Sequence, residues 1–323
     1  MATALATLMS APSVTLARHP TPVDEIGRFA AALGPGSPRI FIKRDDLLGF
    51  AYGGNKVRKL QAVAAEAIAA GADTLVTCGG IQSNHARVTA AAGAALGLGV
   101  VLVLNGREAD ASTGNAALDR LFGAEIRFVA SREERAPMMA RAADELRARG
   151  RRPFVVPLGA STPTGAMGFA RGVAELAASD LRPDVIVHAS SSGGTQAGIV
   201  AGCALLGIRA RVVGVSADES SAALQSTVRT ILEGLADRLG AKPATVGADG
   251  PIEVDDAFVG EGYGIPTPES TEAQRLLATR EGIVPDPVYS SKALAGLVAR
   301  VRRGEFRPDQ QVLFWLTGQQ IGD

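Results

Sequence analysis

Cysteine, histidine and long apolar runs are scarce in this sequence. Two cysteines, Cys78 and Cys203, stand far apart in a chain of 323 residues, so their number excludes a disulfide framework. We expect both to be buried free thiols. The three histidines and these cysteines have no spacing that is typical of a metal site. No apolar run reaches the length of a membrane span. The sequence therefore predicts neither a metal centre nor a membrane protein.

An excess of charge of one sign is also missing, because 33 Lys and Arg side chains face 33 Asp and Glu side chains. Without a basic excess, nothing indicates a nucleic acid or an anionic membrane as partner. No basic residue precedes Arg18, so the N-terminal stretch lacks the charged region of a signal peptide. These features predict a soluble, cytoplasmic protein.

Short β-branched runs alternate with alanine-rich segments from residue 40 almost to the end of the chain. Strands are predicted over 39–46, 73–80, 100–106, 124–131, 153–161, 184–195 and 211–217. Helices are predicted over 56–71, 84–99, 164–179 and 196–207. This alternation predicts an α/β fold with parallel-rich sheets flanked by helices. Loop-forming residues are frequent near 105–115 and 241–268, where we expect insertions or mobile segments.

The stretch GGNKVRKLQ, residues 53–61, predicts a glycine turn followed by a helix with Lys56, Arg58 and Lys59 in its first turn. A helix N-terminus carries the positive end of the macrodipole, so cations are unfavourable there. Cations at this position become favourable when an anion lies nearby, because the helix amides, the dipole and the cations then all attract the anion. A solvated basic turn is the alternative for this cluster taken alone.

A second glycine-rich stretch, SSSGGTQAG at 190–198, follows a buried strand and begins a helix. Gly193 and Gly194 let backbone amides approach a ligand closely, and Ser192 and Thr195 add hydroxyl donors. This arrangement is typical of a phosphate-binding turn, although it lacks the spacing of a Walker loop or of the dinucleotide fingerprint. An ordinary tight strand–helix turn is the alternative.

Three further polar stretches stand at predicted turns. In GGIQSNHAR, Gln82, Ser83 and Asn84 lie at a helix N-terminus, where they can cap the helix or hold a carboxylate. DPVYSSKA places Tyr289 and Ser290 between a proline turn and a helix, and GEGYGIPT holds an aromatic side chain between glycines. Capping alone explains one residue of the first stretch, so a bound carboxylate is favoured for the others.

A phosphate-binding turn, a carboxylate-binding turn and a lysine beside glycines together fit one cofactor, pyridoxal phosphate. The turn anchors the phosphate, and Lys56 forms the Schiff base. Such a lysine must lose its proton to react, so we expect Arg58 and Lys59 to lower the pKa of Lys56. Lys59 is also available for the phosphate.

Six segments in order closely resemble the D-cysteine desulfhydrase and 1-aminocyclopropane-1-carboxylate deaminase family: KRDD, GGNKVRKL, GGIQSNHAR, SSSGGTQAG, GYGIPT and DPVYSSKALAGL. The resemblance covers nearly the whole chain. It implies a two-domain PLP fold type II, like that of the tryptophan synthase β subunit. It also implies a large domain of residues 1–56 and 160–323, a small domain of residues 57–159, and a homodimer.

The resemblance implies a cofactor-binding role for several residues. Lys56 is similar to the Schiff-base lysine, and Lys59 to the lysine that reaches the phosphate. Gly193, Gly194 and Thr195 match the phosphate loop.

Other matches concern the ring and the substrate. Asn84 matches an asparagine at the phenolic oxygen of the cofactor, and Ser290 falls where the partner of the ring nitrogen sits. Tyr263 and Tyr289 match two active-site tyrosines and are expected to be catalytic, as is Ser83. The residues that match the loop for the substrate carboxylate are Gln82, Ser83 and His85, although a histidine in a first helical turn is often structural.

The implied activity is β-elimination from a cysteine-type amino acid. Lys56, displaced by the substrate amine, takes the α-proton, a thiolate leaves, and D-cysteine yields pyruvate, sulfide and ammonia. A hydroxyl at Ser290 cannot hold a proton on the ring nitrogen as a carboxylate does, which favours an easily expelled group over ring opening. The alternatives are the cyclopropane deaminase, an L-cysteate sulfo-lyase, an amino-acid racemase and an inactive PLP-binding protein.

Two departures from the family pattern lie near the predicted ring site. The chain has Ser291 where the family usually has glycine, and it reads WLTGQQIGD where the family has a His-Thr-Gly-Gly stretch. Both departures bear on the substrate preference.

Overall fold

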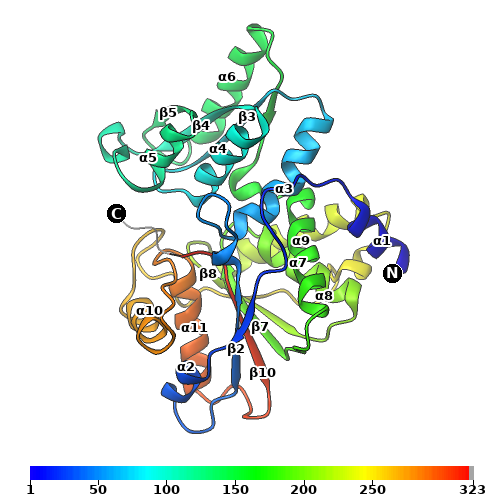
Figure 1. Cartoon of the computed structure of the whole chain (residues 1–323), viewed down its shortest axis with the longest axis vertical. Coiled ribbons are helices and arrows are strands. Elements are labelled where there is room, and N and C mark those ends of the chain that lie inside the picture. The colour runs from blue at the N-terminus through cyan, green and yellow to red at the C-terminus, as the bar shows by residue number, and fades with distance from the viewer. Residues whose placement is uncertain (320–323) are drawn as a thin grey trace.

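Two parallel-rich sheets with helices against them form the computed structural model, which describes residues 1–319 (Figure 1). The larger sheet has the spatial order β1 (Val23–Glu25), β2 (Arg39–Arg44), β10 (Gln311–Leu316), β7 (Val185–Ser190), β8 (Arg211–Ser216) and β9 (Glu253–Asp255). β1 is antiparallel to β2, and the other neighbouring pairs are parallel. The predicted fold class is confirmed.

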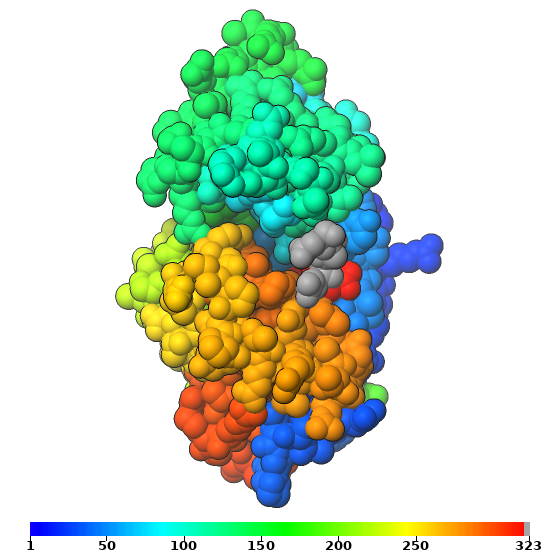
Figure 2. Space-filling view, turned by 90° about the vertical axis from the view of Figure 1, so that its left-hand side faces the viewer, coloured from blue at the N-terminus to red at the C-terminus, as the bar shows by residue number. Residues whose placement is uncertain are grey.

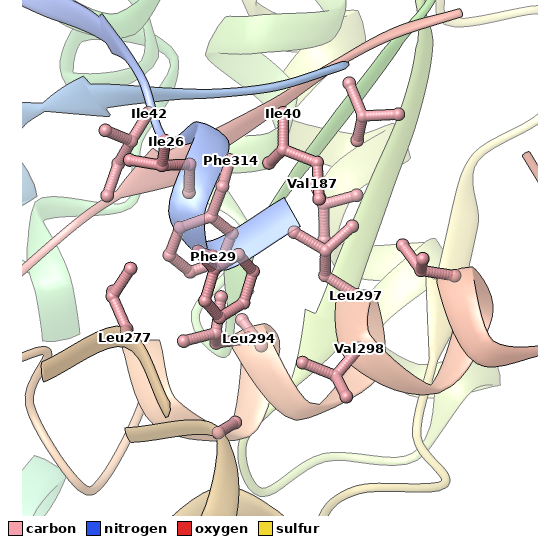
Figure 3. Packing of buried hydrophobic residues seen from close by; sticks show 14 of the residues in the cluster. Ile26, Phe29, Ile40, Ile42, Val187, Leu277, Leu294, Leu297, Val298 and Phe314 are labelled. Atoms are coloured by element: carbon pink, nitrogen blue, oxygen red, sulfur yellow. The ribbon is translucent and has the colours of Figure 1, made fainter. Parts of the chain in front are cut away.

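The central strands of this sheet are apolar at nearly every position because both of their faces are covered. Successive side chains alternate between the faces, so Ile40, Val187 and Phe314 point to one core (Figure 3), whereas Ile186 and Trp315 point to another. The first core is closed by α2 (Gly27–Ala32), α10 (Pro268–Glu281) and α11 (Ser290–Arg302). The second is closed by α7 (Pro163–Ala177) and α8 (Gly194–Leu206), with α1 (Ala2–Ser10) and α9 (Ser221–Arg238) outside them.

The smaller sheet has the order β5 (Glu125–Val129), β4 (Gly99–Asn105), β3 (Thr74–Gly80) and β6 (Pro153–Val155), and all of its pairs are parallel. α3 (Asn55–Ala69) and α4 (Asn84–Leu96) pack on one face, with α5 (Gly114–Leu121) beside α4, and α6 (Arg135–Ala148) covers the other. Four short 3-10 helices complete the structure: η1 (Asp45–Leu47), η2 (Glu108–Ala111), η3 (Leu158–Ala160) and η4 (Pro243–Val246).

Several observed elements were not predicted, among them α1, α2, α10 and β1. The 18-residue helix α9 was not predicted, although Leu224, Val228, Ile231 and Leu235 recur at helical spacing and are buried. The stretch 241–268, predicted to be loop-rich, contains η4 and the edge strand β9. Cys78 and Cys203 are buried free thiols, as predicted. Within residues 1–319, each helix is too short or too polar to cross a membrane.

A buried network of two cations and two carboxylates joins the larger sheet to α3. The Arg58 guanidinium, at the start of α3, donates to both carboxylate oxygens of Asp45 at 2.7 Å and to Glu175 of α7 at 2.6 Å. Lys43 of β2 lies 3.2 Å from Glu175, and the indole nitrogen of Trp315 donates to Asp45 at 2.7 Å. The charges are balanced, and the network ties β2, η1, α3, α7 and β10 together.

The network predicts that loss of one of its residues lowers the free energy of unfolding strongly, whereas loss of an exposed ion pair does not. Asp45→Ala removes a fully buried carboxylate and leaves Arg58 with part of its charge uncompensated. We expect a loss of about 3–5 kcal/mol in the free energy of unfolding, measured by urea denaturation. Asp110→Ala, which breaks the exposed pair with Arg107, is the matched control and should leave the midpoint nearly unchanged. Equal midpoints for the two variants would contradict a structural role for the network.

Candidate active site

Polar side chains line a cleft between the two sheets. Three adjoining pockets meet there and share lining residues, among them Lys56, Asn84, Tyr263, Asp286 and Tyr289. The innermost pocket contains both Lys56 and Lys59. Figure 2 shows the hollow between the part of the chain coloured cyan to green and the part coloured yellow to orange. The cleft lies where β3 and β7 end, which is where open α/β sheets bind ligands.

Lys56 reaches this cleft because a glycine turn starts α3 close to the end of β10. Gly53 and Gly54 adopt positive φ angles of 70° and 95°, and a Cβ on Gly53 would lie 2.5 Å from the Asp46 carbonyl oxygen. The Lys56 ammonium lies 5.9 Å from the centre of the Tyr289 ring. Burial lowers the pKa of Lys56 from 10.5 to about 8, although the charges of Asp286 and Asp218 oppose the shift.

The prediction that Arg58 helps to lower the pKa of Lys56 is wrong. Arg58 belongs to the buried network with Asp45 and Glu175, so its charge is neutralised on the side of α3 away from the cleft. Desolvation is the main cause of the lowered pKa. Positions 56 and 58 differ by about 200° around a helix, whereas positions 56 and 59 share a face, which separates the two roles.

Lys59 is a buried amine without a carboxylate partner. Its side chain is 1% exposed, and its Nζ donates to the Gly159 carbonyl at 3.2 Å and to Ser161 Oγ at 2.9 Å. Among residues 1–319, no carboxylate lies within ion-pairing distance of this nitrogen. Burial and the charge of Lys56 hold the pKa of Lys59 well below its usual value. An anion beside Lys59 would remove this cost.

The start of α8 provides the other half of such an anion site. Gly193, the N-cap residue, has a φ of 79° and no side chain to cap the amides that follow it. Ser161 caps the first of these amides, because its Oγ accepts from the Gly194 amide at 3.2 Å, and the same Oγ lies 2.7 Å from Ser192 Oγ. Ser161 thereby links this helix N-terminus to Lys59. A helix N-terminus, hydroxyls and a buried amine without a carboxylate partner fit a phosphate group.

The predicted phosphate residues lie together. Lys59, Ser192, Gly193 and Thr195 line the innermost pocket, and the Thr195 hydroxyl accepts from Asn55 at 3.1 Å. A Cβ on Gly194 would lie 2.8 Å from the Cα of Ser161, so this position requires glycine. The contact of the predicted phosphate residues with a phosphate group stays a prediction.

The residues at the start of α4 separate into different roles. Ser83 caps the helix by accepting from the Ala86 amide at 3.2 Å, and it also lines the cleft. Gln82 is exposed, and its side-chain oxygen accepts from the Asn115 amide at 2.7 Å, at the start of α5. His85 is buried against the Thr77 hydroxyl at 2.7 Å, and burial holds its pKa well below the usual value, so it is neutral.

Asn84 is the residue of this turn that enters the innermost pocket. Its Oδ1 accepts from Arg87 at 2.7 Å and from Asn115 at 3.0 Å. Because both contacts are to the oxygen, the Nδ2 group is left to donate to a ligand. Asn84 is therefore oriented as a donor toward the pocket, as its predicted role requires.

Tyr263 and Tyr289 form a pair at the junction of the pockets. Their hydroxyl oxygens are 2.7 Å apart, and the rings meet edge to face with centroids at 5.7 Å. The Arg132 guanidinium lies 4.9 Å from the centre of the Tyr263 ring. Burial raises the pKa of both hydroxyls, most for Tyr289, so both are protonated near neutral pH.

Ser290 is fully buried behind the pocket wall rather than on it. Its Oγ lies 3.4 Å from Thr317 Oγ1 and 3.3 Å from the Gly318 carbonyl, and Thr317 borders the pocket. The nearby Asp286 carboxylate, which borders the pocket, accepts from the Tyr289 and Ser290 amides at 2.7 and 3.1 Å. The role of Ser290 toward a ring nitrogen stays a prediction, with Thr317 as the hydroxyl nearer the pocket.

The structure describes the first departure from the family pattern, Ser291, and part of the second, the stretch from Trp315 to the end of the chain. Ser291 is buried, and its hydroxyl has no hydrogen-bond partner within the described chain. Gln319 borders the outer pocket. Residues 320–323 lie outside the described part of the structure.

Sequence reasoning missed Ser161, Asp218, Asp286 and Thr317. Asp286 begins a stretch that the sequence singled out, and Thr317 lies in the stretch noted as a departure, so a signal was present for both. Asp218 reaches the cleft, and Ser161 reaches Lys59 and the start of α8, through tertiary packing alone.

Comparison with known proteins gives consistent matches. Residues 14–318 match the family described as pyridoxal-phosphate dependent enzyme. The D-cysteine desulfhydrase of Serratia proteamaculans (strain 568) is 39% identical over 316 residues, which cover 95% of this chain and 93% of that protein. A putative 1-aminocyclopropane-1-carboxylate deaminase of Pyrococcus horikoshii is 37% identical, with 97% and 93% covered. The crystal structure of an ACC deaminase homologue matches with a TM-score of 0.90 and 36% identity, over 98% and 95% of the two chains. The resemblance inferred from the six segments is confirmed.

The charges around Lys56 make a pH-dependent prediction. The negative charge of Asp218 raises the pKa of Lys56, so Asp218→Asn should shift it below about 8. The measurement is the labelling of Lys56 by a small amine-reactive reagent in the cofactor-free protein, followed by peptide mass spectrometry across pH. Asp110→Asn, at the protein surface, is the control and should leave the profile in place. A shift to higher pH in Asp218→Asn would contradict the assignment.

Proposed function

Because the chain belongs to the pyridoxal-phosphate dependent enzyme family, we propose that it is a lyase that removes the β-substituent of a cysteine-type amino acid, with D-cysteine as the preferred substrate. The observation that carries the proposal is the position of Lys56. It stands between the turn at the start of α8, where Lys59 is buried, and the hydroxyl pair of Tyr263 and Tyr289.

The residues present fit the cofactor. The phosphate would be held by Ser192, Gly193, Gly194 and Thr195 with Lys59, and Lys56 would carry the covalent link. Asn84 Nδ2 and the Thr317 hydroxyl border the pocket that would take the ring, and Ser290 lies behind Thr317. When bound there, pyridoxal phosphate supplies an aldehyde that joins to amines and a ring that withdraws electrons from the substrate α-carbon.

Lys56 is suited to act as the base. A pKa of about 8 leaves part of the population with an unprotonated Nζ at neutral pH, which can accept the α-proton of an amino acid. Above pH 8 the unprotonated form predominates, so the base-dependent step should become faster as the pH rises through this value.

Tyr263 and Tyr289 are suited to donate a proton. One hydroxyl donates to the other at 2.7 Å, and their raised pKa values keep both protonated. A departing thiolate beside the pair can receive a proton from the hydroxyl whose hydrogen is not already shared. Ser83 and the first amides of α4, which border the same pocket, are placed to hold the substrate carboxylate.

The substrate preference rests on the hydroxyls behind the pocket. Ser290 and Thr317 offer no carboxylate to keep a ring nitrogen protonated, and the Asp286 carboxylate is held by the Tyr289 and Ser290 amides at the start of α11. Withdrawal of electrons from the α-carbon is then weaker, which favours a good leaving group such as thiolate over the opening of a cyclopropane ring. D-cysteine rather than L-cysteine is proposed by analogy with the desulfhydrase relative.

Three parts of the proposal concern the whole molecule: its domains, its oligomeric state and its location. The division into a large domain of residues 1–56 and 160–323 and a small domain of residues 57–159 is supported by the two separate sheets. A homodimer and a cytoplasmic location are proposed by analogy with the family. Sedimentation of the purified protein tests the dimer.

The cofactor site predicts a coloured protein with one labelled lysine. After reconstitution with pyridoxal phosphate the protein should be yellow, and borohydride should fix the cofactor to the peptide that contains Lys56. Lys56→Ala should abolish turnover yet retain weak binding through the phosphate site, whereas Lys242→Ala, a variant of a lysine outside the cleft, should behave as the wild type. A label on another lysine would refute the assignment of Lys56.

The leaving-group argument predicts an order of substrates. D-cysteine, L-cysteine, L-cysteate and 1-aminocyclopropane-1-carboxylate are compared by kcat/KM, with pyruvate, sulfide and ammonia measured separately. We expect D-cysteine to give sulfide and pyruvate most efficiently, and the cyclopropane compound to give little ammonia. The highest kcat/KM for the cyclopropane compound would overturn the argument from Ser290 and Thr317. Loss of α-hydrogen without pyruvate would indicate a racemase.

A further inference from the structure

Lys292 is a buried cation that the proposed chemistry does not use. It lies in the first turn of α11, three residues after Tyr289, and its side chain is fully buried. Among residues 1–319, no carboxylate lies within ion-pairing distance of its Nζ. Burial lowers its pKa, and the charge of Asp218 opposes the shift. A buried amine without a carboxylate needs another source of stabilisation.

Three backbone carbonyls supply that stabilisation. Lys292 Nζ donates to Val259 at 2.7 Å, to Gly262 at 2.9 Å and to Ala217 at 3.2 Å. An ammonium group has three N–H donors on one atom, and here each has its own acceptor. No neutral side chain can make three such bonds from a single atom. The geometry is therefore that of the charged form, and these hydrogen bonds are charge-assisted.

The acceptors are not spread evenly over the protein. Val259 and Gly262 belong to the loop of residues 256–267, between β9 and α10, which carries Tyr263. Ala217 immediately precedes Asp218, which lines the cleft. Lys292 therefore holds the loop on both sides of residue 260 and joins it to the helix that Tyr289 begins.

The 256–267 loop has little else to fix its backbone next to Tyr263. Gly260, Gly262 and Gly264 adopt φ angles of 64°, 139° and 81°, which gives the unfolded loop many conformations to lose. The two backbone hydrogen bonds within the loop are long, at 3.3 Å for Val259 and 3.4 Å for Ile265. Phe258 packs on the core at the start of the loop, before the glycines.

We infer that Lys292 is a positioning residue of the active site: its buried ammonium fixes the 256–267 loop so that the Tyr263 hydroxyl meets the Tyr289 hydroxyl. The importance of this contact for turnover rests on the proposed function, but the tether itself does not. Lys292 has no contact with the cleft and acts through Tyr263.

The test uses the full-length holoenzyme and its Lys292→Met variant, which keeps the length of the side chain and removes the donors. Hydrogen–deuterium exchange of peptides that cover 256–267 should become about tenfold faster or more, while peptides from β7 and β10 remain as in the wild type. Lys242→Met, at an exposed lysine outside the cleft, is the control and should not speed exchange in this loop. If the Met variant does not fold, Lys292→Gln carries the same comparison with a smaller increase. Unchanged exchange in the loop overturns the inference.

A kinetic comparison separates positioning from general stability. With the substrate that the protein uses best, we expect Lys292→Met and Tyr263→Phe each to lower kcat/KM about 10- to 100-fold, mainly through kcat. The double variant should be no slower than the slower single variant, because both changes remove the same interaction. Losses that multiply would contradict the inference. Should no amino acid be turned over by the wild type, the proposed function fails, while the exchange experiment still decides the tether.

Discussion

The ion network of Arg58, Asp45, Glu175 and Lys43 is the constraint on which the rest of the site depends. It sits at the first turn of α3, where the helix meets β2, α7 and β10, and it is closed by the indole nitrogen of Trp315. Because its charges balance inside the protein, it fixes the direction of α3 without leaving an uncompensated charge. With the helix so oriented, Lys56 and Lys59 are turned into the cleft. A cluster of cations that looks unfavourable at a helix N-terminus is thus divided between a structural face and a functional one.

The two faces differ in whether their charges are paired. Arg58 makes bidentate contacts with Asp45, whereas Lys59 has only a carbonyl and a hydroxyl, and Lys292 only carbonyls. Lys59 lies near the start of α8, where Ser161 links the two, and a phosphate bound there would supply the anion that Lys59 has no carboxylate to provide. The three hydrogen-bond donors of the Lys292 ammonium are already satisfied, because each donates to a backbone carbonyl. A buried amine without a carboxylate therefore indicates a ligand in one case and a tether in the other, and the number of satisfied donors distinguishes them.

Much of the fold was predictable because strand and helix periods alternate clearly along the chain, and the glycine-rich turns marked where strands lead into helices. Helix α9 was missed despite its regular apolar spacing. At the site, short-range signals located Lys56, Gly193 and the two tyrosines. The role of Arg58 was mistaken because its partners, Asp45 and Glu175, lie 13 and 117 residues away. Ser161, which links Lys59 to α8, also contacts them only through tertiary packing.

The central claim is that the α3 and α8 helix starts form one cofactor site, with Lys56 as the covalent anchor. The most direct measurement is a crystal structure of the protein reconstituted with pyridoxal phosphate. The account predicts electron density continuous with Lys56 Nζ and a phosphate group at Gly193, Gly194 and Thr195 within hydrogen-bonding reach of Lys59. A phosphate bound elsewhere, or a covalent link to a lysine other than Lys56, would contradict it.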